Sequence, residues 1–202
     1  MATRGFRGKR PDQATQSRLP PGQYQTRDFP VLSAGPTPRT PLAEWSLHLE
    51  DVAGAKVASW SWTQLLALPA TTMAVDIHCV TKWSKFDTRW KGVTFEAILA
   101  AAGIVSPPPY VMAFCDGGYT TNVPTPDLCG GRGMVAYEYD GQPLRPEHGG
   151  PARLLVPHLY FWKSAKWVRT IRFMDGDRPG FWEGSGYHMR GDPWQEQRYT
   201  GD

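Results

Sequence analysis

The stretch MAVDIHCVTKW, residues 73–83, decides the fold class because it joins a strand pattern to a thiol. Apolar side chains occupy every second position from Met73 to Cys79, with small or polar side chains between them. This alternation is typical of a β-strand with one buried face. It places Cys79 at the strand's end, just before a loop that contains Lys82 and Trp83. Such a cysteine is either a packing residue or a reactive thiol, and the pattern leaves both open.

The segments around this strand predict many strands and few helices. Ser61 starts a capping box ahead of a short helix over residues 61–68, and Gly103 follows a helix over residues 94–102. Trp45–Glu50 alternates with the period of a strand. Apolar runs between turns rich in Gly and Pro predict further strands at residues 110–115, 134–139, 153–156 and 167–174. The expected class is therefore α+β.

The length and composition indicate one domain. A chain of 202 residues with 41% hydrophobic content can bury a full core. We expect the domain to span residues 26–202 and residues 1–25 to form a flexible basic arm. Four basic residues lie close together in this arm: Arg4, Arg7, Lys9 and Arg10. Because the net charge is only +3 and the other basic residues are spread out, we interpret the run as a solvated tail and expect no nucleic-acid partner.

The sequence also bears on compartment and on cysteine chemistry. No apolar stretch approaches the roughly 20 residues that a membrane helix needs, and no apolar core of a signal peptide follows the basic start. We therefore expect a cytoplasmic protein without a transmembrane segment of its own. The three cysteines, Cys79, Cys115 and Cys129, lack CxxC spacing. Neither a disulfide framework nor a standard zinc site is indicated.

A second motif suits the binding of an anion. It consists of His148-Gly149-Gly150-Pro151-Ala152-Arg153, followed by Lys163-Ser164-Ala165-Lys166-Trp167. Glycines let backbone N–H groups approach an anion, Arg153 offers a two-pronged donor, and Lys163 and Lys166 add positive charge. These residues suit a phosphate cradle, but a basic hairpin on the surface would have the same composition. The motif is neither a Walker loop nor a GxGxxG fingerprint, so the usual nucleotide motifs do not apply.

Taken together, the motifs resemble the molybdopterin-binding domain of the sulfite oxidase-like family, which includes the catalytic subunit of the periplasmic methionine sulfoxide reductase. The resemblance runs from about Asp28 to Lys166 and keeps the order and spacing of the motifs. The matching stretches are His78–Thr81, Arg89–Val93, Ala136–Glu138 with Gly141 and Leu144, His148–Arg153 and Lys163–Trp167. The resemblance implies an α+β fold whose mixed sheets curl into a barrel-like structure with peripheral helices.

The resemblance also implies one molybdenum–molybdopterin cofactor per chain. Cys79 matches the protein thiolate that binds the metal, and a soft sulfur ligand suits such a centre. The residues that match positions around the pterin and its phosphate are Asp28, Val31, Leu32, His148, Arg153, Ser164, Ala165 and Lys166. At position 28 this chain has Asp where a relative has Asn, so this assignment departs from the family pattern.

The implied activity is a two-electron transfer of an oxygen atom to or from a small or sulfur-containing oxo-substrate. We find no counterpart of the haem domain, the immunoglobulin-like domain or the Arg-Asn-His stretch of true sulfite oxidases, and so we do not expect sulfite as the substrate. Electrons must then be exchanged with a separate protein. We expect either a haem-bearing membrane subunit or a ferredoxin- or flavin-type reductase.

Two other classes of protein stay open from the residues alone. Cys79 would be the nucleophile of a thiol enzyme if His78 or His148 served as its base. Neighbouring residues on a strand point to opposite faces, however, which places His78 badly for this role. The chain would instead be a non-catalytic protein if the residues from His148 to Lys166 only bound an anion or a pterin, but such a protein needs no thiol at position 79.

Overall fold

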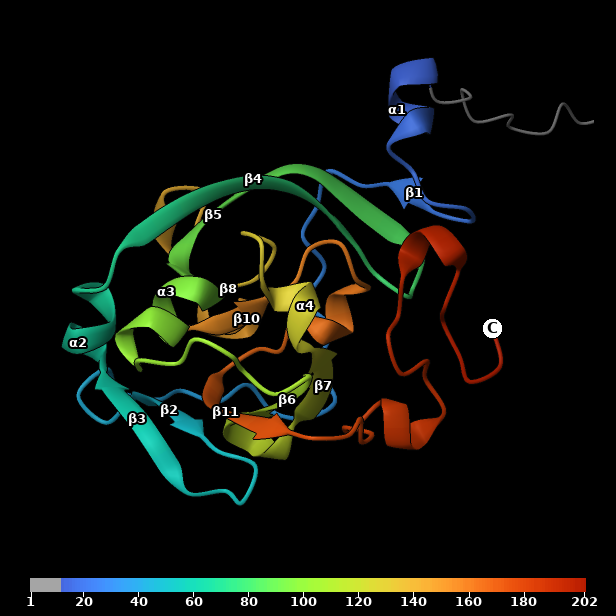
Figure 1. The fold of residues 1–202 in the computed structure, drawn as a ribbon. Helices are drawn as coiled ribbons and strands as arrows, with labels where there is room; N and C mark the ends of the chain where they lie inside the picture. The colour runs from blue at the N-terminus through green and yellow to red at the C-terminus, as the bar shows by residue number, and fades with distance from the viewer. Residues whose placement is uncertain (1–11) are drawn as a thin grey trace, which may run out of the picture.

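The computed structural model describes residues 12–202 and arranges them as two mixed β-sheets with short helices at their edges (Figure 1). The six-stranded sheet consists of β1 (Tyr24–Gln25), β4 (Ala70–His78), β5 (Trp83–Thr94), β8 (Met134–Tyr139), β9 (Gln142–Pro143) and β10 (Arg153–Leu155). The five-stranded sheet consists of β2 (Ser46–Glu50), β3 (Lys56–Ser61), β6 (Tyr110–Cys115), β7 (Thr120–Pro124) and β11 (Val168–Met174). The α+β class is confirmed.

Each sheet is organised around one strand. The five-stranded sheet has the order β3-β2-β11-β6-β7, and β11 runs parallel to β2 and antiparallel to β6. In the six-stranded sheet, β5 pairs with β1, β4 and β8. The long β4–β5 pair curves over the rest of the molecule, as the expected curling of the sheets requires (Figure 1). Within residues 12–202, however, the strands form two sheets rather than one closed barrel.

Four α-helices occur in the described part of the chain: α1 (Gln13–Ser17), α2 (Trp62–Leu66), α3 (Phe95–Ala101) and α4 (Thr125–Leu128). Five 3₁₀ turns accompany them: η1 (Asp116–Gly118), η2 (Pro146–His148), η3 (Phe161–Lys163), η4 (Glu183–Ser185) and η5 (Pro193–Gln195). The predicted capping box starts α2, because Ser61 Oγ accepts from Gln64 N (3.4 Å) and Gln64 Oε1 accepts from Ser61 N (2.8 Å). Gly103 follows α3 with a φ of +71°, which glycine adopts without strain.

The alternation of apolar residues did not predict β5, although it is the central strand of its sheet. Its pairing with β4 shifts between Val75 and Ile77, and its pairing with β8 shifts between Lys91 and Gly92, so no strict period of two survives along it. At Gly92 the two backbones come so close that a Cβ atom would lie 2.2 Å from Val135 O. Glycine is therefore required at this crossing.

The buried apolar side chains form two clusters. The larger joins both sheets with α2 and α3, and includes Trp45, Leu47, Leu65, Phe95, Ile98 and Ile171. The smaller gathers on the six-stranded sheet and consists of Ile77, Cys79, Trp83, Trp90, Met134, Ala136, Leu144, Leu155 and Phe161. Each large side chain buried in this way contributes roughly 1.5–3 kcal/mol to folding. Cys79 thus lies on the buried side of β4, where the alternation placed it.

The expected N-terminal arm is described only in part. Its basic run, from Arg4 to Arg10, lies outside the described residues. The remainder contacts the six-stranded sheet: β1 pairs in parallel with β5, and Arg18 forms ion pairs with Asp76 (2.5 Å) and Asp87 (2.7 Å). The division of the chain between residues 25 and 26 stays a prediction.

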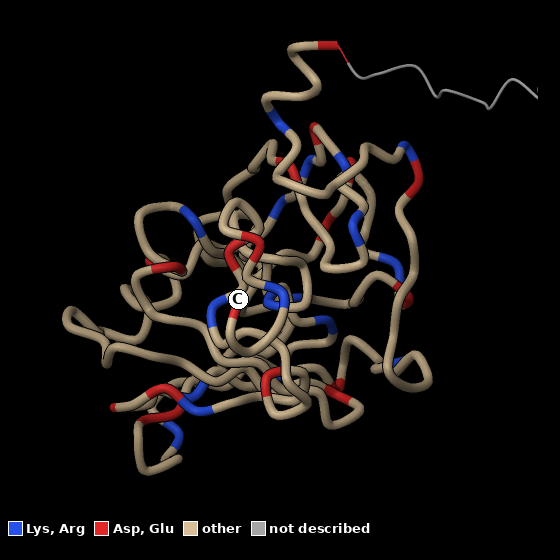
Figure 2. The backbone as a smooth tube through the Cα atoms, turned by 90° about the vertical axis from the view of Figure 1, so that its right-hand side faces the viewer, with Lys and Arg blue, Asp and Glu red and all other residues tan. Residues whose placement is uncertain are grey.

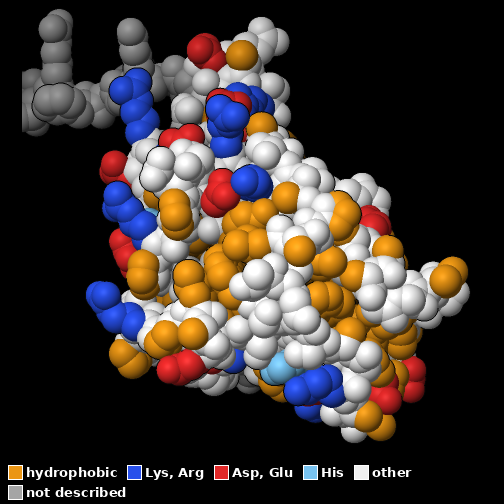
Figure 3. Space-filling view, turned by 90° about the vertical axis from the view of Figure 1, so that its left-hand side faces the viewer, with side chains coloured by type: hydrophobic (Ala, Val, Ile, Leu, Met, Phe, Trp, Pro, Cys, Tyr) orange, Lys and Arg blue, Asp and Glu red, His pale blue; other side chains and the backbone are white. Residues whose placement is uncertain are grey.

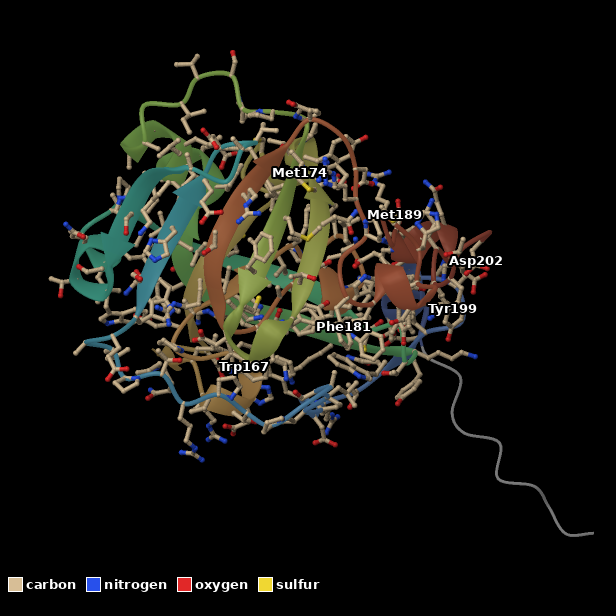
Figure 4. The ribbon with its side chains drawn as sticks, turned by 90° about the horizontal axis from the view of Figure 1, so that it is seen from below. Trp167, Met174, Phe181, Met189, Tyr199 and Asp202 are labelled. Carbon is tan, nitrogen blue, oxygen red and sulfur yellow. The ribbon has the colours of Figure 1, made fainter. Side chains whose placement is uncertain are left out.

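The C-terminal segment returns across the molecule. In Figure 4, β11 leads from Trp167 to Met174, and the chain then runs back to Phe181, at the same end as Trp167. Phe181 N donates a hydrogen bond to Thr120 O (2.9 Å), which fixes the segment beside β7. Residues 176–202 therefore pack on the domain, as their aromatic content indicated.

The surface carries mixed charges. Lys, Arg, Asp and Glu are interspersed along the backbone in Figure 2, in keeping with the small net charge. Figure 3 shows the side that carries α2 and α3 in Figure 1, and there apolar side chains gather in the middle with charged ones around them. No helix within residues 12–202 has both the length and the apolar character that crossing a membrane requires.

Candidate active site

One cavity of about 470 Å³ brings together distant parts of the sequence. Its lining comes from five stretches, within residues 29–36, 79–83, 116–119, 148–167 and 181–187. The two sequence motifs meet here, because Cys79, His148, Arg153 and Lys166 all line this cavity. Several hundred Å³ suits a cofactor or a small ligand. We therefore treat this cavity as the candidate active site.

Cys79 lies in the corner between β4 and β5. Its N donates to Trp83 O (2.8 Å), and Lys82, which adopts a φ of +74°, donates its N–H to Cys79 O (3.0 Å). The residue is 7% exposed, and Thr81 Oγ1 donates to its Sγ (3.1 Å). Burial raises the pKa of the Cys79 thiol, and the hydrogen bond from Thr81 lowers it in part. The thiol is therefore protonated at neutral pH in the protein alone.

His78, the neighbour of this thiol, does not line the cavity. Its Nδ1 lies 2.8 Å from Ser84 Oγ, and its ring packs edge-on against Trp194. Burial lowers the pKa of His78 to about 4, so the imidazole is neutral at pH 7. His78 is thus not placed to act as the base of a thiol nucleophile at Cys79.

Arg153 is a buried cation without an anionic partner. It is 1% exposed; Nη1 donates to His148 O (2.8 Å), Nη2 donates to Ser164 O, and Nε has no partner. Within residues 12–202, no carboxylate forms an ion pair with it. Burial lowers the pKa of Arg153 to about 9. Because a buried, unpaired cation is costly, an anion bound in the cavity would offset that cost.

Lys166 gives the cavity a second cation. Its Nζ donates to two carbonyl oxygens, Leu32 O (2.7 Å) and Glu147 O (2.8 Å). Burial, followed by the charge of Arg153, lowers the pKa of Lys166 to about 8. The backbone of Gly149, with a φ of +108°, lies so close that a Cβ atom there would meet Lys166 Cα at 3.0 Å. The glycine and lysine motifs therefore pack against each other beside Arg153, which suits a cradle and not an exposed hairpin.

His148 lines the cavity as a neutral ring. It stacks on Phe29, with ring centroids 3.9 Å apart and planes inclined by 11°. Burial, and then the charge of Arg153, lowers the pKa of His148 to about 4. At pH 7 the pair thus offers a flat surface with one neutral polar edge.

The structure brings most of the predicted site residues together. Those that line the cavity are Cys79, Leu32, His148, Arg153, Ser164, Ala165 and Lys166. Asp28 and Val31 are exposed and do not line it, and Asp28 N donates to Thr26 Oγ1 (3.1 Å). Their segment has no regular secondary structure and reaches the cavity through Phe29, Pro30 and Leu32 instead.

Lys163 was expected to add charge to the anion site, and that expectation is wrong. Its Nζ lies 2.6 Å from Glu183 Oε1, and both side chains are fully buried. It also donates to Asn122 O (2.9 Å) and to Asn122 Oδ1 (2.8 Å). The 3₁₀ turn η3 directs this lysine into the protein, so its charge is neutralised internally.

The aromatic part of the lining was, for the most part, not predicted. It consists of Phe29, Trp83, Tyr119, Phe161, Trp162, Trp167, Phe181, Trp182 and Tyr187. The sequence contains nine tryptophans, which is a visible excess. Aromatic residues usually pack in cores, however, and composition does not show which of them face a cavity.

Comparison with known proteins identifies the family. The sequence model described as the oxidoreductase molybdopterin binding domain matches residues 34–182. The chain belongs to this family. It is therefore an oxidoreductase, and its cofactor is molybdenum–molybdopterin.

Individual relatives agree with membership of the family. The uncharacterized oxidoreductase YuiH of Bacillus subtilis is 43% identical over 196 residues, which cover 96% of this chain and 98% of YuiH. The putative protein-methionine-sulfoxide reductase subunit YedZ1 of Azospira oryzae is 28% identical over 149 residues, covering 74% of this chain and 56% of that protein. Nitrate reductase [NADH] of Volvox carteri is 24% identical over 189 residues, covering 75% of this chain and 21% of that enzyme.

A solved structure shows the same fold. The sulfane dehydrogenase SoxCD from Paracoccus pantotrophus matches with a TM-score of 0.60 and 21% identity, covering 69% of this chain and 40% of that chain. The family to which the motifs pointed, and the mixed α+β fold that this resemblance implied, are both confirmed.

The residues of the cavity fit the family's cofactor. Arg153 and Lys166 are cations without carboxylate partners in the described chain, and Arg153 Nε has an unused hydrogen. Both suit a phosphate. Cys79 adds a soft sulfur to the same lining, which suits a molybdenum centre.

Proposed function

We propose that this oxidoreductase transfers an oxygen atom to or from a small or sulfur-containing oxo-substrate, with Cys79 as the protein ligand of molybdenum. The observation that carries the proposal is that the Cys79 thiol and the unpaired Arg153 cation face one cavity. A soft ligand beside a phosphate-binding cation suits a metal–pterin cofactor. A thiol nucleophile would need a base instead; His78 does not line the cavity, and among residues 12–202 the Cys79 thiol is hydrogen-bonded to Thr81 and not to His148.

The phosphate of the cofactor would be held by Arg153 and Lys166 through charge-assisted hydrogen bonds. Ser164 and Ala165 would flank it, because they line the same cavity, directly precede Lys166, and Ser164 O accepts a hydrogen bond from Arg153 Nη2. The Ser164 hydroxyl accepts a hydrogen bond from Val156 N (2.8 Å), and its own hydrogen is not used by this contact. Ser164 would therefore be held in place by Val156 and would donate its O–H hydrogen to the phosphate.

The pterin would be contacted by His148, Phe29 and Leu32. The first two present their stacked rings, and Leu32 is fixed by the hydrogen bond from Lys166 to its carbonyl. Roles for Asp28 and Val31 stay predictions. One cofactor for each chain is part of the same proposal.

When bound, the cofactor supplies a metal that exchanges two electrons and an oxygen atom with the substrate. Cys79 must lose its proton to become a ligand, since burial keeps the free thiol protonated. The hydroxyl of Thr81, which donates to Sγ, favours the thiolate that results. His148 is neutral and would contact the cofactor without adding charge.

We further propose that electrons are exchanged with a separate partner, either a haem-bearing membrane subunit or a ferredoxin- or flavin-type reductase. The name of the relative YedZ1, a reductase subunit, supports an assembly of this kind. The cytoplasmic location stays a prediction. Fractionation of cells that express the chain would test it, and recovery from the periplasm would contradict it.

Oxygen transfer is tested with protein from a host that makes the cofactor. We expect about one molybdenum and about one pterin per chain. With a reduced viologen as electron donor, the protein should remove an oxygen atom from a member of a panel of sulfoxides, N-oxides and oxyanions, oxidising about two dye molecules per product. Fully loaded protein that reduces no member of the panel, and oxidises none of the corresponding reduced compounds, would contradict the proposal.

A further inference from the structure

Part of the cavity lining is a continuous set of aromatic rings that the cofactor assignments do not use. It consists of Tyr119, Trp162, Phe181, Trp182 and Tyr187, and we call it the aromatic wall. Neighbouring ring centroids lie 5.9 Å apart for Tyr119–Phe181, 5.0 Å for Phe181–Trp182, 5.0 Å for Trp182–Tyr187 and 5.1 Å for Trp162–Tyr187. These are normal distances for interacting aromatic rings. The wall is therefore one packed surface.

The wall begins in the protein and ends at the solvent. Trp162 is 9% exposed, whereas Phe181 is 44% exposed. Figure 4 shows Phe181 on the segment that returns after β11, at the same end of that strand as Trp167. Because Cys79 lines the same cavity, a substrate that enters beside Phe181 would pass along the wall to reach the metal ligand.

Buried polar contacts hold the wall in place. Glu183 Oε1 pairs with Lys163 Nζ at 2.6 Å and also accepts from Trp162 Nε1 (2.8 Å). Tyr119 Oη donates to Trp162 O (2.6 Å). Since Glu183 directly follows Trp182, this network ties both tryptophans to η3. The wall is thus rigid, as a surface that selects a ligand by shape should be.

Within residues 12–202, the cavity offers no spare cation to a substrate. The only lysine and arginine that the described chain contributes to the lining are Lys166 and Arg153, which the cofactor would use. The other charged residue in the lining is Asp116, which accepts from Thr40 Oγ1 (2.6 Å) and pairs with Arg169 (3.3 Å). A small oxyanion would lose its hydration here without gaining an opposite charge, which is unfavourable.

Arg198 lies near this region but is already bound. It donates to Val80 O (2.8 Å) and to Pro21 O (3.2 Å), and its guanidinium covers the ring of Tyr160. It does not line the cavity. The electrostatic environment of the substrate is therefore set by neutral aromatic rings.

We propose that the aromatic wall selects an uncharged substrate that carries an aromatic ring next to its transferable oxygen, such as an aryl sulfoxide, over small oxyanions. This inference rests on the proposed function, oxygen-atom transfer at Cys79-bound molybdenum. An aryl group would stack on the wall and be removed from water, while the oxygen points to the metal site.

The reaction for the aryl sulfoxide balances as R–S(=O)–R′ + 2 H⁺ + 2 e⁻ → R–S–R′ + H₂O. The bond between sulfur and oxygen breaks, and the sulfur is reduced to a thioether. The oxygen leaves as water with two protons from solvent. The electrons come from a reduced one-electron dye in the assay, and from the redox partner in the cell.

The test compares three substrates of cofactor-loaded protein: methyl phenyl sulfoxide, dimethyl sulfoxide and nitrate. Stacking and burial of the ring should raise kcat/KM for methyl phenyl sulfoxide at least about tenfold over dimethyl sulfoxide, and nitrate should be the poorest substrate. Binding is measured separately, through the change of tryptophan fluorescence on titration with methyl phenyl sulfone, which resembles the substrate but is not turned over.

The variant Trp182→Leu should remove most of the preference for the aryl substrate and weaken sulfone binding about tenfold, with molybdenum and pterin contents unchanged. Trp194→Leu is the matched control, because Trp194 is a 50% exposed tryptophan of the C-terminal segment that does not line the cavity. It should leave the preference and the binding unchanged.

The outcomes separate this inference from the function on which it rests. Better turnover of nitrate than of either sulfoxide would overturn the role of the wall but leave oxygen transfer intact. Equal turnover of both sulfoxides, or an equal loss in both tryptophan variants, would do the same. Absence of turnover with all three substrates, in protein that holds molybdenum and pterin, would overturn the role of the wall, and the proposed function would fall as well only if the full panel and the corresponding reduced compounds also gave no turnover.

Discussion

Arg153 and Lys163 are both cations that the fold buries almost completely, yet they have opposite surroundings. Lys163 has a carboxylate, Glu183 Oε1, at 2.6 Å. Arg153 has only carbonyl oxygens, and its Nε has no partner. The charge of a buried cation with its own carboxylate is compensated within the fold, whereas the charge of one without an anion is compensated only when a ligand supplies the opposite charge. Lys163 therefore supports the site from within the protein, whereas Arg153 is available to bind an anion in the cavity.

The two lysines of the second motif show the same difference. Lys163 and Lys166 are three residues apart, but only Lys166 lines the cavity. The 3₁₀ turn η3 ends at Lys163, and the chain then changes direction. The role of a charged residue therefore depends on the turn that orients its side chain, and the sequence alone does not show that turn.

The largest expected effect follows from removal of Glu183, because Lys163 is then buried without a partner. We expect Glu183→Ala to lower the free energy of unfolding by about 3–5 kcal/mol, as measured by urea denaturation. The double variant Lys163→Met/Glu183→Leu should recover most of this loss, because it buries no charge. If Glu183→Ala lowers the free energy of unfolding by less than about 1 kcal/mol, Glu183 does not compensate the buried charge of Lys163, and the contrast with Arg153 fails.

An intermediate effect, on binding instead of folding, is expected from Arg153→Met. In protein made without the cofactor, the free energy of unfolding should stay the same or rise, because Met removes a buried cation that has no anionic partner. The cofactor should bind roughly tenfold to a hundredfold more weakly, because a charged hydrogen bond contributes about 1.5–3 kcal/mol. Pterin content per chain after dialysis reports this loss. Full retention of pterin would show that Arg153 does not hold the phosphate.

The smallest effect is a pH dependence from Lys166. Burial lowers its pKa from 10.5 to about 8, so between these values the folded, cofactor-free chain binds fewer protons than the unfolded chain. The free energy of unfolding rises with pH wherever the unfolded state binds more protons than the folded state. Lys166 should therefore raise the free energy of unfolding by about 1 kcal/mol between pH 8 and pH 10. Melting temperatures across this range should show the rise in wild type relative to Lys166→Met.

The comparison with Lys166→Met separates this lysine from the tyrosines and cysteines that titrate in the same range. Lys56→Met serves as a control, since Lys56 is exposed on β3 and should give the wild-type pH profile. Identical profiles for Lys166→Met and wild type would mean that the amine of Lys166 is not held in a desolvated site.

Sequence patterns predicted the parts of the fold that depend on local residues. The alternation around Cys79 located β4, and the capping signals located α2 and α3. These succeed because a buried face or a helix end imposes its pattern within a few residues. β5 was missed because its bulges interrupt the alternation and because its position is fixed by partners far away in sequence.

The cofactor end of the site was more predictable than the substrate end. Six of the eight residues assigned to the pterin and phosphate line the cavity, because short motifs bring glycine and basic residues together. The aromatic wall joins Tyr119, η3 and the segment from Phe181 to Tyr187, which are distant in sequence. No local pattern shows that such residues meet, and Lys163 was misassigned for the same reason.

The central claim, that Cys79 binds the molybdenum, is tested most directly by the electron paramagnetic resonance spectrum of the molybdenum(V) state in Cys79→Ser. Serine is close to cysteine in size but is a much harder ligand, so the spectrum should change shape while the pterin, held by Arg153 and Lys166, is retained. Turnover with dyes should nearly vanish, whereas Cys115→Ser and Cys129→Ser should keep the wild-type spectrum and activity. An unchanged spectrum with substantial turnover in Cys79→Ser would place the metal on another residue.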